Sequence, residues 1–391
     1  MCAGYLLPYR LRVAGRILLF GATGYTGRLT AAALVRTGLP IVLVSRSADR
    51  VRALAEELAP SSPDGRTPDT AVADAADRGS VHALLNGPQD VLLSTVGPFL
   101  RLGQPAVEAA IEAGAAYVDS TGESPFIRWV FQDAGPRAAR TGARLLPALA
   151  YDYVPGNLAG ALALTQAQEH GASTVRLQIG YFTPGGMGMS SGTRASVAGV
   201  LVEPGYAFRN GQLESARAGA RTATFTVDGR RLDGASVGGS EQFTLPRLSP
   251  ALREVDVFLG WAGRWTRPAS AMGAISDLAL RLPGARAGAR RLATALAGTA
   301  TGQGPDAEQR ARARTVVLAR AYDASGTQVA GVRLVGPTPY ELTADLLAWG
   351  ARACLASRTH GAGALGPVDA FGLDEVIDGC ARAGLVAQPS P

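Results

Sequence analysis

Three consecutive residues, Tyr151, Asp152 and Tyr153, carry side chains that can move a proton. A phenol hydroxyl can deliver a proton to a bond that is being reduced, and a neighbouring carboxylate can orient the phenol. We therefore predict Tyr151 and Tyr153 as catalytic proton donors and Asp152 as their orienting partner. The sequence leaves an alternative open, in which the tyrosines only pack a domain junction and water supplies the proton.

Other kinds of chemistry lack the residues they need. The 38 residues counted as lysine or arginine are all arginine, which excludes lysine Schiff bases and the Tyr-xxx-Lys dyad of short-chain dehydrogenases. The three histidines follow no Ser-His-Asp order, and the three cysteines are far apart with no histidine at ligand spacing. We expect no hydrolase, no disulfide framework and no metal site. Hydride transfer needs less of the protein, because a cofactor carries the reaction.

A cofactor site is indicated by the stretch RILLFGATGYTG at residues 16–27. Its apolar run predicts a buried strand, and a helix is expected to begin near Thr26 after a glycine turn. Such a turn brings backbone N–H groups against a pyrophosphate, and glycine is needed because a Cβ would hold the phosphates away. The predicted contacts of this turn with a dinucleotide are Gly21, Thr23, Gly24, Tyr25, Thr26 and Gly27.

The tip of the next strand indicates which dinucleotide binds. IVLVSRS at residues 41–47 is a β-branched run typical of a second parallel strand. A site for NAD usually carries Asp or Glu at this tip, whereas this chain has Ser45, Arg46 and Ser47. A carboxylate would repel a 2′-phosphate, while a guanidinium and hydroxyls would bind it. We predict NADP(H) as the cofactor, with the alternative that Arg46 only begins the next helix as a solvated side chain.

Further strand ends extend the predicted crevice. Asp74 lies at the exit of a third strand, where it either accepts from the adenine amino group or caps a helix beginning near Ser80. A fourth strand begins at Val91 and runs into a Gly-Pro turn. Ligands bind at the carboxyl ends of the strands in open α/β sheets, so we expect these residues beside the nicotinamide: Thr95, Val96, Gly97, Pro98 and Phe99.

The length of 391 residues indicates two domains. A helix is expected to start at Asn157. After it, residues 173–183 alternate as an antiparallel strand with one buried face should, and residues 316–335 predict a hairpin. The segments TATFTVDG, EQFTLPR and VDVFLGW are further strand candidates. Residues 340–356 predict a long helix that packs back on the first domain.

Two features of the second half are open to a functional or a structural interpretation. Phe182, Met187 and Met189 either form an adaptable apolar wall for a substrate or pack a sheet. A basic amphipathic helix within residues 269–314 either meets an acidic partner, such as an acyl carrier protein or a membrane surface, or is only solvated. Exposed strands in this half favour a homodimer.

Charge and hydropathy narrow the class of protein. The net charge is +6, but the arginines are scattered rather than gathered in one run, so we expect an anionic small ligand and no nucleic acid. No apolar run reaches the length of a transmembrane segment, and the first residues lack the pattern of a secretory signal. We expect a cytoplasmic protein without a transmembrane segment.

The motifs GATGYTG, VSRS, DAAD, TVGPF, YVDSTGE and YDYVPG occur in the order seen in saccharopine dehydrogenase-like reductases. The chain most resembles the branch that includes the bacterial trans-acting enoyl reductases. This resemblance implies an α/β fold, in which a Rossmann doubly wound parallel sheet carries an inserted second α/β domain built on a mainly antiparallel sheet. One departure is that Tyr151 and Tyr153 stand where related sequences often have small or apolar residues.

The resemblance also implies a domain division. Residues 1–157 would form the dinucleotide-binding domain, completed by the C-terminal helices of residues 338–391. Residues 158–337 would form the substrate-binding and dimerisation domain.

The function predicted from these observations is an NADPH-dependent reductase that transfers hydride to a C=C bond of a polyketide-like or acyl substrate. Imine reduction is the alternative within catalysis, and it would need a site for a substrate carboxylate, for which Arg128, Arg176, Arg194 and Arg247 are available. A non-catalytic sensor that binds NADP is the alternative from another class.

Overall fold

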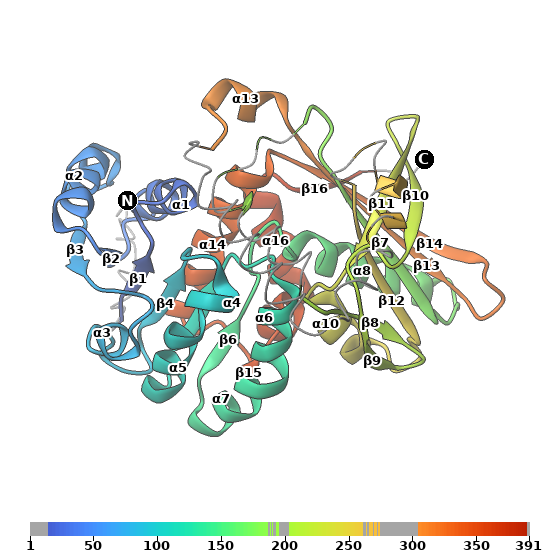
Figure 1. Ribbon diagram of the computed structural model, residues 1–391, viewed down its shortest axis with the longest axis horizontal. Helices are drawn as coiled ribbons and strands as arrows, with labels where there is room; N and C mark the ends of the chain where they lie inside the picture. The colour runs from blue at the N-terminus through green and yellow to red at the C-terminus, as the bar shows by residue number, and fades with distance from the viewer. Residues whose placement is uncertain are drawn as a thin grey trace, which may run out of the picture.

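The computed structural model describes residues 15–388, apart from residues 187, 189, 191–192, 195–202, 261–262, 264–265, 269, 272 and 274–303. The described strands form two neighbouring sheets (Figure 1), one parallel and one mainly antiparallel. This architecture confirms the predicted fold class. Met187, Met189 and most of the expected basic helix lie outside the described residues.

The first sheet contains seven parallel strands in the order β15-β6-β5-β4-β1-β2-β3. From β3 to β6 this is the strand order of a Rossmann fold. Four strands, β1, β2, β4 and β5, are buried at every residue, which explains their almost continuous apolar sequence. The bounds are Ile17–Phe20 (β1), Ile41–Ser45 (β2), Asp69–Val72 (β3), Val91–Ser94 (β4), Ala116–Asp119 (β5), Arg144–Leu146 (β6) and Gly363–Ala364 (β15).

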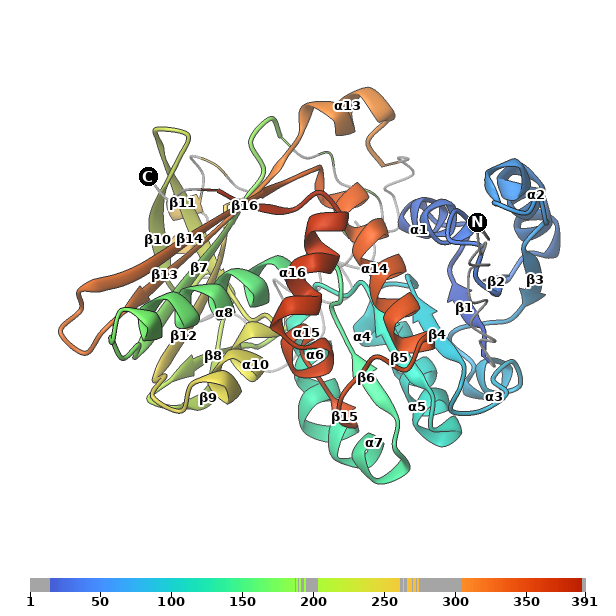
Figure 2. The same cartoon turned by 180° about the vertical axis from the view of Figure 1, so that it is seen from behind.

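Helices cover both faces of this sheet. Helices α5 and α7 lie over it in Figure 1, and α14 lies over it in the reverse view of Figure 2. The predicted long C-terminal helix is α14, and it packs against α1, β4 and β5, which confirms the expected return to the first domain. The helices of this half are Tyr25–Val35 (α1), Ala48–Leu58 (α2), Arg78–His82 (α3), Phe99–Leu102 (α4), Gln104–Ala113 (α5), Ser124–Trp129 (α6), Gly135–Thr141 (α7) and Pro339–Leu355 (α14).

Two helix starts differ from the prediction. The helix expected at Asn157 already begins at Val154 as α8 (Val154–Glu169), because Pro155 fits a first turn in which no N–H is needed. The helix near Ser80 begins at Arg78, and its N-cap is Asp77 rather than Asp74.

The second sheet contains nine strands, of which seven lie in the order β10-β11-β12-β7-β13-β14-β16. Strand β8 pairs with β12 and β9, so these two strands form a side branch. The hairpin predicted for residues 316–335 is confirmed as β13 and β14. The bounds are Arg176–Phe182 (β7), Gly205–Arg209 (β8), Gln212–Ala216 (β9), Thr222–Val227 (β10), Arg230–Val237 (β11), Glu254–Leu259 (β12), Thr315–Tyr322 (β13), Gln328–Gly336 (β14) and Val386–Gln388 (β16).

The strand expected at residues 173–183 differs from the prediction in direction and burial. Strand β7 runs parallel to β12 and antiparallel to β13, so it is only half antiparallel. Both of its faces are covered. Ile179 and Tyr181 are buried in the main core, while Phe182 belongs to a second cluster with Phe225 and Phe258.

The segment EQFTLPR is helical, so the strand prediction for it was wrong. It forms α10 (Glu241–Leu248), and its buried residues, Glu241, Gln242, Thr244 and Leu245, recur at helical spacing. Short apolar segments do not distinguish a helix from a strand by pattern alone.

The C-terminal residues connect the two sheets. After α14 come β15 in the first sheet, α15 (Pro367–Phe371) and α16 (Leu373–Arg382). Strand β16 then returns to the second sheet beside β14. Among the described residues, no helix is both long enough and apolar enough to cross a membrane.

Candidate active site

The glycine turn after β1 presents backbone rather than side chains. Gly21 has a φ of +78°, in the left-handed region that favours glycine, and the N–H of Gly24 donates to its carbonyl at 2.9 Å. A Cβ on Gly27 would lie 2.0 Å from the same carbonyl oxygen. Gly24 is the N-cap of α1, and no side chain caps the N-terminal N–H groups of this helix. The N-terminal N–H groups of α1 are therefore left for a ligand, as an anion site at a helix N-terminus requires.

At the tip of β2, Ser45 and Ser47 form hydrogen bonds within the protein, whereas the side chain of Arg46 is exposed. The hydroxyls of Thr23 and Ser45 lie 3.1 Å apart, and Ser45 also accepts from the N–H of Ser47 at 3.3 Å. Ser47 is the N-cap of α2, where its hydroxyl accepts from the N–H of Arg50. Arg46 is exposed and has no hydrogen bond or ion pair with any described residue. Its guanidinium is the group available to a 2′-phosphate.

Tyr25 connects the glycine turn to a distant part of the chain. Its hydroxyl donates to the carbonyl of Pro305 and accepts from Arg310 at 3.0 Å. Its ring packs edge-on against that of Tyr340, with the ring centroids 4.9 Å apart. The hydroxyl of Tyr25 is therefore already bonded within the protein, which leaves its backbone as the part that a ligand can use.

The other two predicted contacts at this edge of the sheet, Thr26 and Asp74, form hydrogen bonds within the protein. The carbonyl of Thr26 accepts from the hydroxyl of Thr30 inside α1. Asp74 is exposed, and its carboxylate accepts from the N–H of Ala76 at 3.0 Å. Asp74 thus stabilises its own turn.

The segment after β4 lies against the glycine turn. The hydroxyl of Thr95 donates to the carbonyl of Phe20 at 3.1 Å, and a Cβ on Gly21 would lie 2.9 Å from a methyl of Val96. The Gly97–Pro98 peptide is cis. The structure therefore brings the first and fourth strand ends together, as their predicted positions at one edge require.

A buried carboxylate holds the next residues of this segment. Glu123 is 3% exposed, and its two oxygens accept from the N–H groups of Phe99 at 2.8 Å and Leu100 at 2.9 Å. These are the first two residues of α4, so Glu123 satisfies that helix start with both oxygens. In the sequence analysis Glu123 occurs only as the last residue of the motif YVDSTGE, and the structure gives it this specific role.

The predicted catalytic residues lie together beside Gly122, at the carboxyl end of β5. The hydroxyl of Tyr153 lies 3.5 Å from the carbonyl of Gly122, and a Cβ on Gly122 would lie 2.8 Å from Oδ2 of Asp152. Tyr151 and Tyr153 are buried. Burial raises the pKa of Tyr153 well above its ordinary value, which makes this phenol a weak proton donor.

Asp152 differs from its neighbours because it is only partly buried as a residue. Its Oδ1 atom is nevertheless shielded from solvent and has no hydrogen-bond partner among the described residues. The loss of solvation raises the pKa of Asp152 to about 7. Of the three predicted residues, Asp152 is thus the one whose proton can be exchanged near neutral pH.

Two residues that the sequence analysis missed complete this cluster. Tyr181 lies on β7, and its hydroxyl accepts from the N–H of Gly156 at 2.7 Å and donates to Oε1 of Glu241 at 2.7 Å. Its ring packs edge-on against those of Tyr151 and Tyr153. In the sequence, Glu241 is only the first residue of EQFTLPR, and nothing in the neighbouring residues indicates that its carboxylate is buried.

Glu241 is fully buried. Its Oε2 atom has no hydrogen-bond partner among the described residues. Burial, with a smaller contribution from the charge of Asp152, raises the pKa of Glu241 to about 8. Asp152, beside Gly122, and Glu241, on α10, are therefore two carboxyl groups with raised pKa values.

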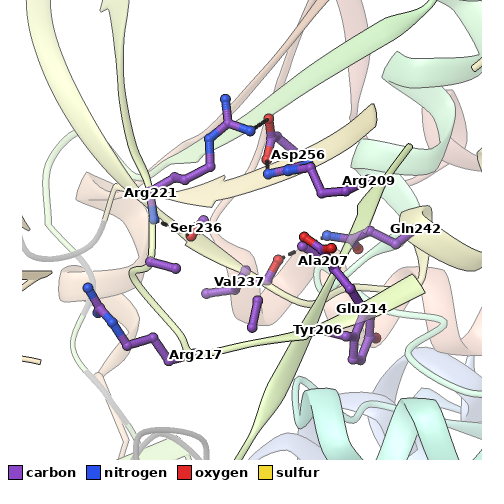
Figure 3. A pocket seen from close by; sticks show the side chains of 12 residues that line it. Tyr206, Ala207, Arg209, Glu214, Arg217, Arg221, Ser236, Val237, Gln242 and Asp256 are labelled. Atoms are coloured by element: carbon purple, nitrogen blue, oxygen red, sulfur yellow. Dashed lines mark hydrogen bonds and ion pairs between the residues drawn. The ribbon is translucent and has the colours of Figure 1, made fainter. Parts of the chain in front are cut away.

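A cavity of about 90 Å³ lies on the second sheet next to this cluster (Figure 3). On its wall, the buried carboxylate of Asp256 forms ion pairs with Arg209 and Arg221. Tyr206 and Gln242 line the cavity and hold the loop before α10, since the Tyr206 hydroxyl donates to the Gly239 carbonyl at 2.9 Å and Gln242 accepts from the Gly239 N–H at 2.8 Å. The cavity wall thereby fixes the loop that carries Glu241.

Comparison with known proteins identifies the first part of the chain. Residues 17–148 match the family model described as the saccharopine dehydrogenase NADP binding domain. This domain contains every predicted cofactor contact, from Gly21 to Phe99. The resemblance seen in the sequence is confirmed over these residues.

Two curated relatives match part of the chain. A candidate trans-acting enoyl reductase of Mycobacterium tuberculosis is 38% identical over 187 residues, which cover 47% of this chain and 44% of that protein. A trans-acting enoyl reductase of Mycobacterium leprae is 40% identical over 144 residues, which cover 36% of this chain and 34% of that protein. The match therefore spans less than half of the length of these relatives.

A solved structure shares the whole fold. Apo saccharopine dehydrogenase (L-glutamate-forming) from Saccharomyces cerevisiae has a TM-score of 0.57 at 14% identity, with 96% of this chain and 100% of that chain covered. At this identity the similarity shows the fold alone.

The NADP-binding domain fits a phosphorylated dinucleotide. The glycine turn forms a cradle that a Cβ would fill, and Arg46 offers a guanidinium where NAD sites carry a carboxylate. NADP(H) is therefore the cofactor of this domain. No group of three or more His, Cys, Asp or Glu residues that could hold a metal ion occurs in the described part of the chain.

Proposed function

We propose that the protein is an NADPH-dependent reductase that transfers hydride to a C=C bond of an acyl or polyketide-like substrate. The observation that carries this proposal is the position of the Asp152 cluster at the carboxyl end of β5, next to the segment that lies against the glycine turn. A hydride donor and a proton donor would thus approach one substrate at the carboxyl ends of strands of the first sheet. Residues 158–337 would be the substrate-binding and dimerisation domain, and residues 1–157 with 338–391 the dinucleotide-binding domain.

The residues of the first sheet would bind and orient the cofactor. Backbone groups from Gly21 to Tyr25 would hold the pyrophosphate, and Arg46 would bind the 2′-phosphate. Thr95 to Phe99 would lie along the nicotinamide, with their backbone held by Glu123. When bound, NADPH supplies the hydride.

Asp152 would supply the proton. This assignment exchanges the roles predicted from the sequence, in which the tyrosines donate and Asp152 orients them. A general acid works best when its pKa lies near the operating pH, and burial places the pKa of Asp152 at about 7 while holding that of Tyr153 well above its ordinary value. Tyr151 and Tyr153 would exclude water from the reacting bond.

Three of the four arginines named for imine reduction form internal contacts. Arg128 stacks on Tyr206 and donates to a backbone carbonyl, and Arg176 stacks on Tyr322. Arg247 forms an ion pair with a carboxylate at 2.8 Å. With these three committed to internal contacts, C=C reduction is favoured over reduction of an imine that carries a carboxylate.

The substrate would arrive on another protein. The relatives are named trans-acting enoyl reductases, which supports a substrate delivered by a partner. We propose an acyl carrier protein as that partner, because a thioester-bound enoyl chain is the acyl form of such a substrate.

Oxidation of NADPH by the purified full chain tests this function. We expect turnover with an enoyl thioester on an acyl carrier protein and none with a cyclic imine. Turnover with the imine alone would identify an imine reductase. Binding of NADPH without turnover of either substrate would instead support a sensor.

A further inference from the structure

A strap, residues 304–312, lies against the first turn of α1. It contains α13 (Ala307–Arg312) and leads into β13 of the second sheet. Figure 1 shows α13 between α1 and the strands of that sheet. The side chains of Asp306 and Gln309 each accept from the backbone N–H of the other residue, at 2.8 and 3.1 Å. This capping box gives the strap a defined shape of its own.

The strap is bonded to Tyr25, the first residue of α1 after the glycine turn. The Tyr25 hydroxyl donates to the carbonyl of Pro305 and accepts from Arg310. Arg310 also donates to the Pro305 carbonyl at 2.9 Å and to the carboxylate of Glu341 on α14 at 3.3 Å. Its side chain is 17% exposed. The Arg310 guanidinium therefore joins the strap to both α1 and α14.

The ring of Tyr25 is enclosed as closely as its hydroxyl. A Cβ on Gly304 would lie 2.7 Å from the ring carbons, and Tyr340 packs edge-on against the same ring. The Tyr340 hydroxyl in turn accepts from the N–H of Ser190 at 2.8 Å. The strap cannot leave α1 unless these contacts with Tyr25 break.

The other side of the strap lies on the loop that follows β7. A Cβ on Gly185 would lie 2.2 Å from the carbonyl oxygen of Arg312. The N–H of Arg314, just after the strap, donates to the carbonyl of Pro184 at 3.2 Å. The strap therefore links the second sheet to the turn that forms the phosphate end of the cofactor site.

We propose that Arg310 is a positioning residue that fastens the strap against the phosphate end of the cofactor site, so that the dinucleotide enters and leaves when the contact between Arg310 and Tyr25 opens. The N–H groups that would hold the pyrophosphate belong to the same first turn of α1 as Tyr25. A pyrophosphate on this turn would lie beside the strap. The proposal rests on the NADP-binding domain and not on the reductase function proposed above.

The contact between Arg310 and Tyr25 joins protein groups only. Because the same groups form it with and without a cofactor on the turn, its free energy stabilises both states equally and cancels in the dissociation constant. It opposes entry as well as release, since both require the strap to move. Its strength should therefore be seen in the two rates.

Stopped-flow fluorescence of NADPH with the purified full chain measures both rates without any substrate. For Arg310→Ala we expect association and release to become about tenfold faster, the factor for one charge-assisted hydrogen bond that breaks in the slow step, with the dissociation constant unchanged. Arg312→Ala is the matched control, because Arg312 lies on the same helix and pairs with the exposed carboxylate of Glu308. This variant should change neither rate.

A second variant shows whether Arg310 acts through Tyr25. Tyr25→Phe keeps the ring against Tyr340 and removes the hydroxyl that Arg310 binds, so release should again be faster. Added to Tyr25→Phe, Arg310→Ala should accelerate release by less than it does alone, because the two side chains share one contact.

Three results would overturn the proposal. A merely structural Arg310 would lower the melting temperature of Arg310→Ala and leave both rates unchanged. A direct contact of Arg310 with the cofactor would accelerate release alone and so weaken binding. Full additivity of the two substitutions would mean that Arg310 does not act through Tyr25. If Arg310→Ala does not fold, the release rate of Tyr25→Phe decides, and an unaltered rate contradicts the role of the strap.

Discussion

The glycine turn and the junction cluster are built in opposite ways. In the turn, side chains are absent or bonded elsewhere, and neighbouring residues from Gly21 to Gly27 leave backbone groups open to a ligand. In the cluster, the reactive side chains are those of residues 151–153, Tyr181 and Glu241, and all of them except Asp152 are buried. The comparison teaches that binding of the cofactor depends on local sequence, whereas control of the proton depends on tertiary packing.

Two buried glutamates show the same contrast within one residue type. Glu123 has both oxygens satisfied by the N–H groups of a helix start, so it serves the shape of the cofactor segment. Glu241 has one oxygen bonded to Tyr181 and one without a partner among the described residues. The number of hydrogen bonds, rather than burial, separates the structural carboxylate from the one available for proton chemistry.

Substitution of Asp152 tests the cluster side of this comparison and should have the largest effect. Asp152→Asn removes the proton donor, so we expect kcat to fall by about a hundredfold to ten-thousandfold, the range for loss of a general acid. The dissociation constant for NADPH should not change, because Asp152 lies outside the turn. Steady-state kinetics and calorimetry measure the two quantities.

Tyr153→Phe is the matched control, because its hydroxyl makes only a long contact of 3.5 Å with the Gly122 carbonyl. We expect it to retain most of the activity. An active Asp152→Asn beside an inactive Tyr153→Phe would restore the tyrosine as the donor.

Substitution of Gly27 tests the turn side. Gly27→Ala would place a Cβ 2.0 Å from the Gly21 carbonyl oxygen, so the turn must open. We expect NADPH to bind about a hundredfold more weakly, which is about 3 kcal/mol, since displacement of a binding group by about 1 Å has effects of this size. Gly142→Ala is the control, because Gly142 has no atom within 4 Å of its Cβ position, and its φ of +78° strains any other residue there. It should reduce stability and leave NADPH binding unchanged, and equal loss of binding in both variants would contradict the assignment.

Substitution of Arg46 tests whether this exposed side chain makes the cofactor site selective for NADPH over NADH. Arg46→Ala should weaken NADPH binding by about tenfold to a hundredfold and leave NADH binding unchanged, as loss of a charge-assisted contact predicts. Arg52 on α2, the helix that follows Arg46, is exposed but paired with Asp49 at 3.6 Å, which makes Arg52→Ala the control. An unchanged ratio of NADPH to NADH affinity would show that Arg46 is only solvated.

What the sequence could predict follows the same division. The turn, the strand tips and the NADP-binding domain were predicted because their residues are consecutive and their geometry is local. Tyr181 and Glu241 are 60 residues apart, and the helix carrying Glu241 was taken for a strand. The burial that raises the pKa of a carboxyl group comes from segments that only the tertiary fold brings together, so the exchange of roles that we propose between Asp152 and the tyrosines was not predictable.

The last prediction concerns stability, and it tests the burial of Glu241 without any ligand. Burial raises the pKa of Glu241 from its ordinary value of 4.5 to about 8, so between these values the folded state binds one proton more than the unfolded state. Stability from this group is therefore fully present below the lower value and is lost as the pH rises towards the upper one, by about 1.4 kcal/mol per pH unit. Glu241→Gln lacks this dependence, so its free energy of unfolding relative to the unaltered protein should improve steadily across this range. Asp119, whose pKa burial raises to about 7, contributes equally to both proteins and cancels in the difference. Urea unfolding at several pH values measures this difference, and parallel curves would mean that Glu241 is solvated and that the two regions differ less than their hydrogen bonds indicate.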